Sequence, residues 1–184
     1  MSAMGRVEGK VAIITGSTYG IGEAIARVLA KEGAVSIITG RSQEDGKKVV
    51  AEITSNGGRA EYYPLDVTDE KRIEDVANAV YKKYGRIDIL VNNAGVAGPN
   101  KPTHEYARVE WEWVFDVNVT GAFLCTKYVV PYMQKRKEGK YRLHILYLWH
   151  HRRSRSSGLP CYQGRQPGYG QDRCPALCQR QYPR

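Results

Sequence analysis

Long apolar runs are absent from this 184-residue sequence. No stretch approaches the roughly 20 apolar residues that a membrane-spanning helix needs. The first six residues, Met1-Ser-Ala-Met-Gly-Arg, contain no apolar core of a signal peptide. We therefore expect a cytoplasmic protein that does not associate with membranes and whose thiols stay reduced.

Cysteine and histidine are scarce, and their spacing is unlike that of the common metal sites. The four cysteines form no Cys-x-x-Cys pair, and Cys174 and Cys178 have no histidine at zinc-finger distance. The adjacent His150 and His151 have no further spaced ligands. The sequence therefore predicts that the protein binds no metal.

Acidic residues are nearly absent from the last quarter of the chain. Residues 140–184 contain nine Lys and Arg but one acid, Asp172, whereas residues 1–139 contain 19 basic and 18 acidic residues. The length suits one domain with a substantial core. A net charge of +9 would ordinarily suggest a nucleic acid or an anionic surface as partner. Because almost all of this charge follows residue 139, we interpret residues 1–139 and 140–184 separately.

Residues 1–139 alternate strand patterns with helix patterns. The continuous apolar runs at 11–15, 35–39 and 87–91 are typical of strands buried on both faces. Apolar residues recur at helical spacing between them, and Gly33 and Gly85 end two of these segments. The alternation predicts an α/β fold, a Rossmann-like doubly wound parallel sheet covered by helices on both faces. Two further helices are expected after the last run, the second kinked at Pro131.

A glycine-rich turn, Thr15-Gly16-Ser17-Thr18-Tyr19-Gly20-Ile21-Gly22, joins the first strand to the first helix. This is where a doubly wound fold holds the pyrophosphate of a dinucleotide. Gly16 permits the tight turn, Gly20 lets the backbone approach the phosphates, and Gly22 lets the helix pack closely on the strand. Free N–H groups at the start of the helix would face the anion. The alternative is a glycine turn without a ligand, which the strand–turn–helix context disfavours.

Three further motifs follow in order: Leu65-Asp66-Val67-Thr68, Asn92-Asn93-Ala94-Gly95 and Val117-Asn118-Val119-Thr120-Gly121. With the T-G-x-x-x-G-x-G turn, they make residues 7–139 resemble the short-chain dehydrogenase/reductase family. The resemblance implies a Rossmann fold, NAD(P) binding, and reversible hydride transfer between the nicotinamide and a small-molecule carbonyl or alcohol. It also implies that a full-length family form can be a homo-oligomer.

The resemblance assigns roles to individual residues. Asp66 and Val67 match the segment that contacts the adenine ring, and Asn118 matches the active-site Asn that holds a water in the proton relay. Tyr19 is expected to pack over the cofactor. The predicted cofactor-binding residues are Gly16, Ser17, Tyr19, Gly20, Ile21, Gly22, Arg41, Asp66, Val67, Asn92, Ala94 and Gly95.

Several of these residues also have structural interpretations. Asp66 at a strand end can accept hydrogen bonds from an adenine amino group, or it can act as the N-terminal partner of the next helix. Asn92 and Asn93 can satisfy loop backbone groups with their side-chain amides. Asn118 lies between two helical stretches and can instead mark a kink or a cap.

Cofactor choice depends on the end of the second strand. NAD-binding relatives usually place an acidic residue there to bind the ribose hydroxyls, but this chain has Gly40 followed by Arg41. No carboxylate would repel a 2′-phosphate, and the guanidinium of Arg41 can pair with it. We therefore favour NADP over NAD. The alternative for Arg41 is an ordinary exposed loop charge.

The catalytic pair of the family is missing from the sequence. Family members carry a Tyr and a Lys four residues apart on one helix, and a Ser on the preceding strand. No Tyr here has a Lys four residues later, although Tyr132 with Arg136 comes near this pattern. Because this Tyr is the proton donor or acceptor of the reaction, we predict that the printed chain has negligible dehydrogenase activity.

Residues 140–184 form a basic segment outside the family pattern. Residues 141–148 are apolar enough for one more strand, but Gly, Pro, Gln and Arg then dominate, so this part is expected to be incomplete or disordered. Tyr162, Tyr169 and Tyr182 would allow stacking on bases, which leaves a non-catalytic nucleotide-binding module with a basic, anion-binding tail as an alternative function. No nucleic-acid motif organises these residues, so we do not expect nucleic-acid binding.

A reading-frame error explains residues 140–184 better than a functional basic tail does. With suitable synonymous codons read one base later, Tyr141 to Trp149 can encode T-V-Y-I-S-S-I-S-G, and Leu159 to Gln163 can encode Y-L-A-T-K. Asp172 to Pro183 can encode T-D-A-R-H-F-A-K-D-N-I-R. These strings resemble the family's Ser strand, its Y-x-x-x-K helix and the segment after that helix. We therefore favour out-of-frame sequence for residues 140–184.

Overall fold

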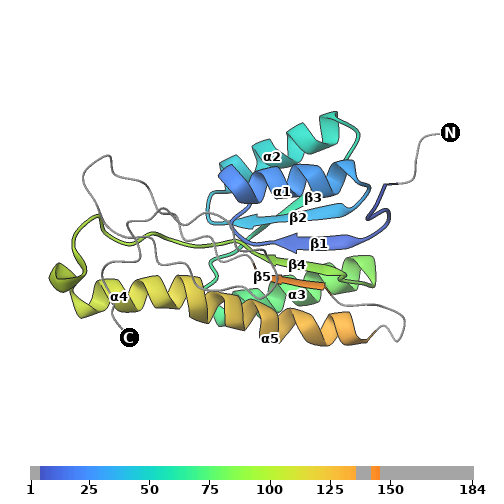
Figure 1. Cartoon of the computed structure of the whole chain (residues 1–184). Helices are drawn as coiled ribbons and strands as arrows, with labels where there is room; N and C mark the ends of the chain where they lie inside the picture. The colour runs from blue at the N-terminus through green and yellow to red at the C-terminus, as the bar shows by residue number, and fades with distance from the viewer. Residues whose placement is uncertain (1–4, 136–141, 146–184) are drawn as a thin grey trace, which may run out of the picture. The chain divides into compact units, whose positions relative to one another are not determined.

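A computed structural model describes residues 5–135 and 142–145, and these form one parallel sheet with flanking helices (Figure 1). The strand order is β3-β2-β1-β4-β5, and every neighbouring pair is parallel. The strands are β1 (Val11–Ile14), β2 (Val35–Gly40), β3 (Arg59–Pro64), β4 (Ile89–Asn92) and β5 (Arg142–Ile145). Since β5 pairs with β4, the sheet reaches beyond residue 139, the expected end of the domain.

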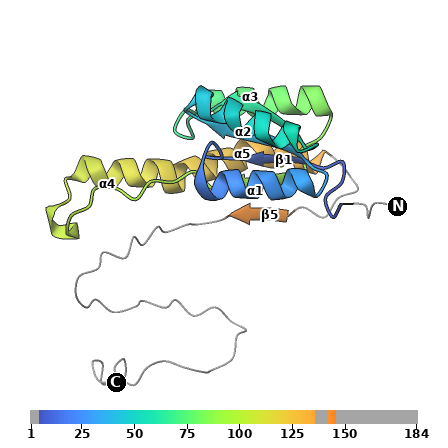
Figure 2. The ribbon, with the colours of Figure 1, turned by 90° about the horizontal axis from the view of Figure 1, so that it is seen from above.

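Helices cover both faces of the sheet, as the doubly wound prediction requires (Figures 1 and 2). Helices α1 (Gly20–Lys31) and α2 (Gln43–Ser55) lie on one face, and α3 (Glu70–Tyr84) and α5 (Gly121–Gln134) lie on the other. The helix α4 (Arg108–Phe115) precedes α5, after a short 3-10 turn at Thr103–Glu105. No helix among the described residues is long and apolar enough to cross a membrane.

Two apolar layers form the core because successive strand residues point to opposite faces. Val11 and Ile13 of β1 pack in the layer beneath α3 and α5, whereas Ala12 and Ile14 pack in the layer beneath α1 and α2. All four are at most 2% exposed. The continuous apolar run of β1 thus reflects burial on both faces, which confirms the strand prediction.

Polar residues and glycines set the helix ends. Ser42 caps α2 by accepting a hydrogen bond from the Asp45 N–H, and Asp69 caps α3 by accepting one from the Arg72 N–H. Gly85 ends α3 in the left-handed conformation, with φ of 67°. Ser42 and Asp69 thus fix where α2 and α3 start after their strands, and Gly85 fixes where α3 ends.

The two helices expected after β4 form one continuous helical segment. Between α4 and α5 lies a five-residue π-helix, η2 (Asp116–Thr120), closed by a hydrogen bond from the Gly121 N–H to the Asp116 carbonyl. Short π turns inside helices are frequent at functional sites. Helix α5 continues past Pro131 to Gln134.

The expected strand at residues 141–148 is found as β5, Arg142–Ile145. The basic segment that follows, and with it the predicted disorder and frame error, lies outside the described residues.

Candidate cofactor site

The carboxyl ends of the parallel strands lie at one edge of the sheet, and there the predicted motifs converge. The glycine-rich turn follows β1, Arg41 follows β2, residues 65–67 follow β3, and residues 93–95 follow β4. Because β1 lies between β2 and β4, the chain leaves β1 where the strand order reverses. This switch point is the place where open α/β sheets bind ligands.

Thr15 and Asn93 hold two of these loops together. The backbone N–H groups of Asn93 and Ala94 both donate to Thr15 Oγ1, at 2.9 and 3.0 Å. Asn93 Nδ2 donates to the carbonyls of Thr15 and Gly16, both at 2.9 Å. The side chain of Asn93 therefore satisfies loop backbone, as expected, and it fixes the shape of the glycine-rich turn.

The three glycines of the turn meet different surroundings. A Cβ at Gly16, whose φ is 61°, would lie 2.8 Å from the Cα of Ala94. A Cβ at Gly22 would lie 2.4 Å from Asn93 Nδ2 and 2.5 Å from the Gly16 carbonyl oxygen. A Cβ at Gly20 would meet no protein atom within 4 Å. Gly16 and Gly22 thus allow close packing, whereas Gly20 leaves open space through which a ligand can approach the backbone.

Ser17 is fully buried, and its polar groups are used within the protein. Its hydroxyl donates to the Ile14 carbonyl at 2.7 Å and accepts from the Thr39 N–H at 3.0 Å. Its own N–H donates to the Thr39 carbonyl at 2.9 Å. These bonds attach the glycine-rich turn to β2, so the buried side chain of Ser17 fixes the position of the turn.

Tyr19 and Ile21 lie at the start of α1 and are 73% and 40% exposed. Tyr19 is the N-cap residue of α1, but its side chain makes no capping hydrogen bond. The first turn of the helix therefore keeps N–H groups that no side-chain cap satisfies. An anion above this turn would find hydrogen-bond donors and the positive end of the helix dipole.

Arg41 and Asp66 follow neighbouring strands, and Arg41 is exposed. Asp66 Oδ1 accepts hydrogen bonds from the N–H and hydroxyl of Thr68, at 3.0 and 2.8 Å. The Thr68 backbone bond is the main cause that holds the pKa of Asp66 below its usual value, with a smaller contribution from the charge of Arg41. Since Asp69, and not Asp66, caps α3, the structural alternative for Asp66 is a turn with Thr68. Val67 next to it is buried against Gly121.

Asn92 ends β4 and is 5% exposed. Its Nδ2 donates to Thr126 Oγ1 at 3.1 Å and to the Ala122 carbonyl at 3.4 Å, which links β4 to α5. Its Oδ1 is buried and has no partner among the described residues. Ala94 is partly buried, while Gly95 is exposed and lies close to the Asn118 side chain.

Asn118 lies in the π turn η2, and its side-chain amide binds the loop after β4. Asn118 Oδ1 accepts from the Val96 N–H at 2.8 Å, and Asn118 Nδ2 donates to the Val96 carbonyl at 2.9 Å. This pair of bonds attaches the α4–α5 segment to residues 95 and 96. Asn118 is thus neither a helix cap nor a break between helices.

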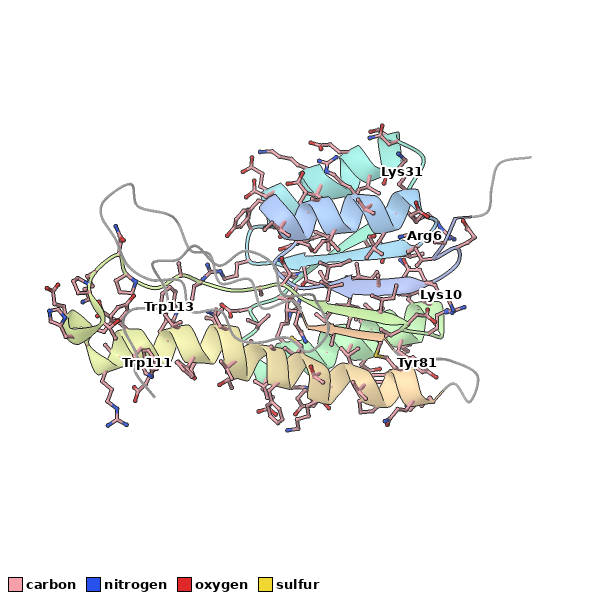
Figure 3. All side chains as sticks on the ribbon, viewed as in Figure 1. Arg6, Lys10, Lys31, Tyr81, Trp111 and Trp113 are labelled. Atoms are coloured by element: carbon pink, nitrogen blue, oxygen red, sulfur yellow. The ribbon has the colours of Figure 1, made fainter. Side chains whose placement is uncertain are left out.

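The opposite, amino edge of the sheet holds a depression, and each charged residue in its lining pairs with a charged residue beside it. Arg86 binds Asp88, which also accepts from the Val11 N–H at 2.9 Å. Asp88 lies 3.7 Å from Lys10, which is labelled at this edge in Figure 3. Glu61 pairs with Lys83. Burial is the main cause that raises the pKa of Tyr84, which keeps its hydroxyl protonated.

Sequence reasoning did not list Thr15, Thr18, Asn93 or Val96 among the site residues, although they shape the site. Thr15 and Asn93 could have been found because they belong to the quoted T-G-x-x-x-G-x-G and N-N-A-G motifs, whereas nothing in the sequence marks Thr18 or Val96. Within the described residues, no group of three or more His, Cys, Asp or Glu side chains is placed to hold a metal ion.

Comparisons with known proteins agree with the fold and with the motifs at the carboxyl edge of the sheet. The family model described as short chain dehydrogenase matches residues 10–141. The 2,3-dihydro-2,3-dihydroxybenzoate dehydrogenase of Bacillus subtilis is 42% identical over 139 residues, which cover 76% of this chain and 52% of that protein. The 3-oxoacyl-acyl-carrier-protein reductase FabG of Thermotoga maritima is 42% identical over 134 residues, covering 73% of this chain and 54% of that protein.

Solved structures show the same likeness. A metagenomic short-chain oxidoreductase in complex with NADP superimposes with a TM-score of 0.69 at 37% identity, covering 76% of this chain and 61% of that one. A hydroxysteroid dehydrogenase from Escherichia coli gives a TM-score of 0.67 at 37% identity, covering 71% and 55%. The chain spans about half the length of the curated relatives it matches. On its motifs, its sheet topology and the family model over residues 10–141, this chain belongs to the short-chain dehydrogenase family.

Proposed function

We propose that the protein binds NAD(P) at the carboxyl edge of its sheet, and that its lineage oxidises alcohols or reduces ketones with this cofactor. The observation that carries the proposal is the convergence of the glycine-rich turn, Arg41 and Asp66 around the ends of three adjacent strands. The open space at Gly20 and the uncapped first turn of α1 fit a pyrophosphate.

Each part of the cofactor has candidate partners among the described residues. The N–H groups at the start of α1 would bind the pyrophosphate, Asp66 and Val67 would lie at the adenine, and Tyr19 and Ile21 would cover the dinucleotide. The loop at Ala94 and Gly95, which Asn93 and Asn118 position, would face the nicotinamide half. When bound, the nicotinamide supplies or accepts the hydride.

Asn118 is the one predicted catalytic residue within the described chain. Its amide is already bonded to Val96, so it would hold a water through the remaining lone pair of Oδ1 or through its backbone carbonyl in the π turn. The proton donor is missing, because no Tyr-x-x-x-Lys pair occurs in the sequence. We therefore expect the printed chain to bind cofactor without measurable turnover of alcohols or ketones.

We attribute that absence to a reading-frame error within codons 138–184. Sequencing the DNA through this region tests the attribution, because it requires the frame one base later to encode Y-x-x-x-K. A sequence without that motif in the shifted frame would exclude it.

We propose NADP as the preferred cofactor, because an exposed Arg41 follows β2 and the last residue of the strand carries no carboxylate. A structural neighbour was solved with NADP. Titration of the full chain with NADPH and NADH, followed by cofactor fluorescence, tests both binding and preference. Arg41→Ala should weaken NADPH binding roughly tenfold, by loss of a charge-assisted hydrogen bond, and leave NADH binding unchanged.

Arg59→Ala is the matched control for Arg41→Ala, since Arg59 lies at the amino edge of the sheet and pairs with Glu8. It should change the affinity for neither dinucleotide. A wild-type chain that binds neither NADPH nor NADH would overturn the proposed function. An equal loss of NADPH and NADH binding in Arg41→Ala would overturn the role given to Arg41.

We also propose a cytoplasmic homo-oligomer for the full-length family form. Helix α4 carries Trp111, labelled in Figure 3, and Phe115. Their ring centroids are 4.6 Å apart, and both residues are more than 40% exposed. Phe123 on α5 is a further exposed aromatic residue, at 62%. Exposed aromatic clusters of this kind are typical of protein interfaces.

The alternative function is a non-catalytic nucleotide-binding module with a basic tail, supported by the charge of residues 140–184. NADPH titration beside a DNA-binding assay at several salt concentrations separates the two. A steep loss of DNA binding with salt would favour the tail. Cofactor binding without it would favour the enzyme lineage.

A further inference from the structure

The last residue of β2, Gly40, occupies the position where an acidic side chain would bind the ribose hydroxyls of NAD. Its φ is not in the left-handed region, so the backbone does not require glycine here. A Cβ at this position would lie 2.7 Å from Thr18 Cγ2 and 3.2 Å from Thr18 Oγ1. Real Cβ atoms do not approach a carbon atom to 2.7 Å, so Thr18 occupies the space that a side chain at position 40 needs.

Thr18 has little freedom to move away. It is 6% exposed. The preceding residue, Ser17, is hydrogen-bonded to β2 twice: its N–H donates to the Thr39 carbonyl at 2.9 Å, and its Oγ accepts from the Thr39 N–H at 3.0 Å. Both branches of the Thr18 side chain face Gly40, so at least one of them still faces Gly40 after any change of rotamer.

Gly40 is also held in place by β3 and the residue that follows it. Its carbonyl oxygen accepts hydrogen bonds from Tyr62 Oη at 2.7 Å and from the Leu65 N–H at 3.0 Å. The end of β2 is thus held to β3 by two bonds, while the glycine-rich turn is held to β2 by two others. Separating Thr18 from Gly40 would break one of these pairs.

We propose that Thr18 is a specificity-determining residue, which keeps any side chain, and above all a carboxylate, out of position 40. Recognition at the ribose is then left to the exposed guanidinium of Arg41, which suits a 2′-phosphorylated dinucleotide. The proposal rests on the proposed function for its ligand, whereas the steric exclusion itself is a property of the protein without cofactor.

The first experiment measures that exclusion by thermal unfolding of the full chain without cofactor. Gly40→Ala adds only a Cβ, and at an unstrained φ this change would otherwise be neutral or slightly stabilising. We expect it to lower the melting temperature by about 5 °C because of overpacking. In a Thr18→Ala background, the same change should have almost no effect, since the nearest remaining atom, Thr18 Cβ, lies at an ordinary 3.5 Å.

The control background is Thr18→Val, which keeps both branches and removes only the hydroxyl. In this background Gly40→Ala should be as harmful as in the wild type. A Gly40→Ala variant that melts like the wild type would overturn the proposal. An equal loss of melting temperature in the Thr18→Ala background would overturn it too.

The second experiment measures cofactor choice with Gly40→Asp. Alone, this change should weaken NADPH binding without giving tight NADH binding, because Thr18 sterically prevents the carboxylate from reaching the position that binds the ribose hydroxyls. The double variant Thr18→Ala/Gly40→Asp should bind NADH roughly tenfold more tightly than Gly40→Asp, as expected for residues in direct contact. If Gly40→Asp alone binds NADH as well as the double variant, Thr18 does not determine specificity.

The two experiments also separate this proposal from the proposed function. A wild-type chain that binds no dinucleotide contradicts the proposed function, while the melting temperatures still decide whether Thr18 excludes a side chain at position 40. Binding of NADPH together with a harmless Gly40→Ala overturns this proposal alone.

Discussion

The two edges of the sheet use their polar residues in opposite ways. At the amino edge, side chains neutralise one another: Arg86 and Lys10 face Asp88, and Lys83 faces Glu61. At the carboxyl edge, uncharged side chains such as Thr15, Ser17 and Asn93 bind backbone groups of the neighbouring loops.

This difference explains why one edge can bind a ligand and the other only stabilises the fold. Ion pairs at the amino edge leave few groups for a partner. At the carboxyl edge, buried hydrogen bonds hold the loops in place. The N–H groups at the start of α1 and the guanidinium of Arg41 are therefore available to bind a dinucleotide. Substitutions that alter the loops or the available groups of the carboxyl edge should therefore change binding, and substitutions at the amino edge should change stability alone.

The largest effect is expected for Gly22→Val at the carboxyl edge. A Cβ at this position would already lie 2.4 Å from Asn93 Nδ2, so the side chain would push α1 away from the loop after β4. We expect a loss of about 3 kcal/mol in the free energy of unfolding and no detectable NADPH binding. Urea unfolding and NADPH titration measure the two effects.

Gly57→Ala is the control for Gly22→Val, since Gly57 lies in the loop before β3, at the amino edge, and a Cβ there meets open space. Its φ of 79° should cost about 1 kcal/mol, without any change in NADPH affinity. Unchanged NADPH binding by Gly22→Val would show that close packing at Gly22 does not shape the site.

A smaller effect, confined to stability, is expected for Asp88→Asn at the amino edge. Burial opposes ionisation of Asp88, but hydrogen bonds from Arg86 and the Val11 N–H outweigh it and hold the pKa of Asp88 below its usual value. Because the folded-state pKa is lowered, this contribution is present above the unfolded pKa of about 3.9 and is lost as the pH falls through the folded-state pKa.

Asp88→Asn should therefore lower the free energy of unfolding at pH 7 by about 2 kcal/mol and flatten its dependence on pH below about 4. Unfolding curves between pH 3 and pH 7 would show this, with NADPH affinity as the control readout. A weaker NADPH affinity in Asp88→Asn would mean that the two edges are coupled, contrary to the comparison.

The sequence predicted those parts of the fold that depend on local pattern. Apolar runs such as Val11–Ile14 identify strands buried on both faces, and Gly85 ends α3 because glycine adopts positive φ without strain. The glycine-rich turn could be placed between strand and helix for the same reason. Its supports could not be, since the bonds from Asn93 to Thr15 join residues 78 positions apart.

Two features of the candidate site were beyond the reach of sequence patterns. The π turn at Asp116–Thr120 has no distinctive composition, so the sequence suggested two helices where the chain makes one continuous segment. The contact between Thr18 and Gly40 depends on how closely the loop approaches β2 in three dimensions. Burial of Ser17 was likewise hidden, because a serine in a glycine-rich turn is equally compatible with binding a phosphate.

The smallest effect is expected for Thr126→Val, which tests whether Asn92 is a cofactor ligand or a structural residue at the carboxyl edge. Thr126 Oγ1 accepts the hydrogen bond from Asn92 Nδ2, and valine keeps the volume while removing this acceptor. The Asn92 amide would retain only the Ala122 carbonyl at 3.4 Å. We expect a loss of about 1 kcal/mol in the free energy of unfolding, with unchanged NADPH affinity if Asn92 is structural. If NADPH binding weakens instead, the Asn92 amide contributes to the cofactor site, as the sequence motif predicted. Buried side chains at the carboxyl edge then also take part in cofactor binding.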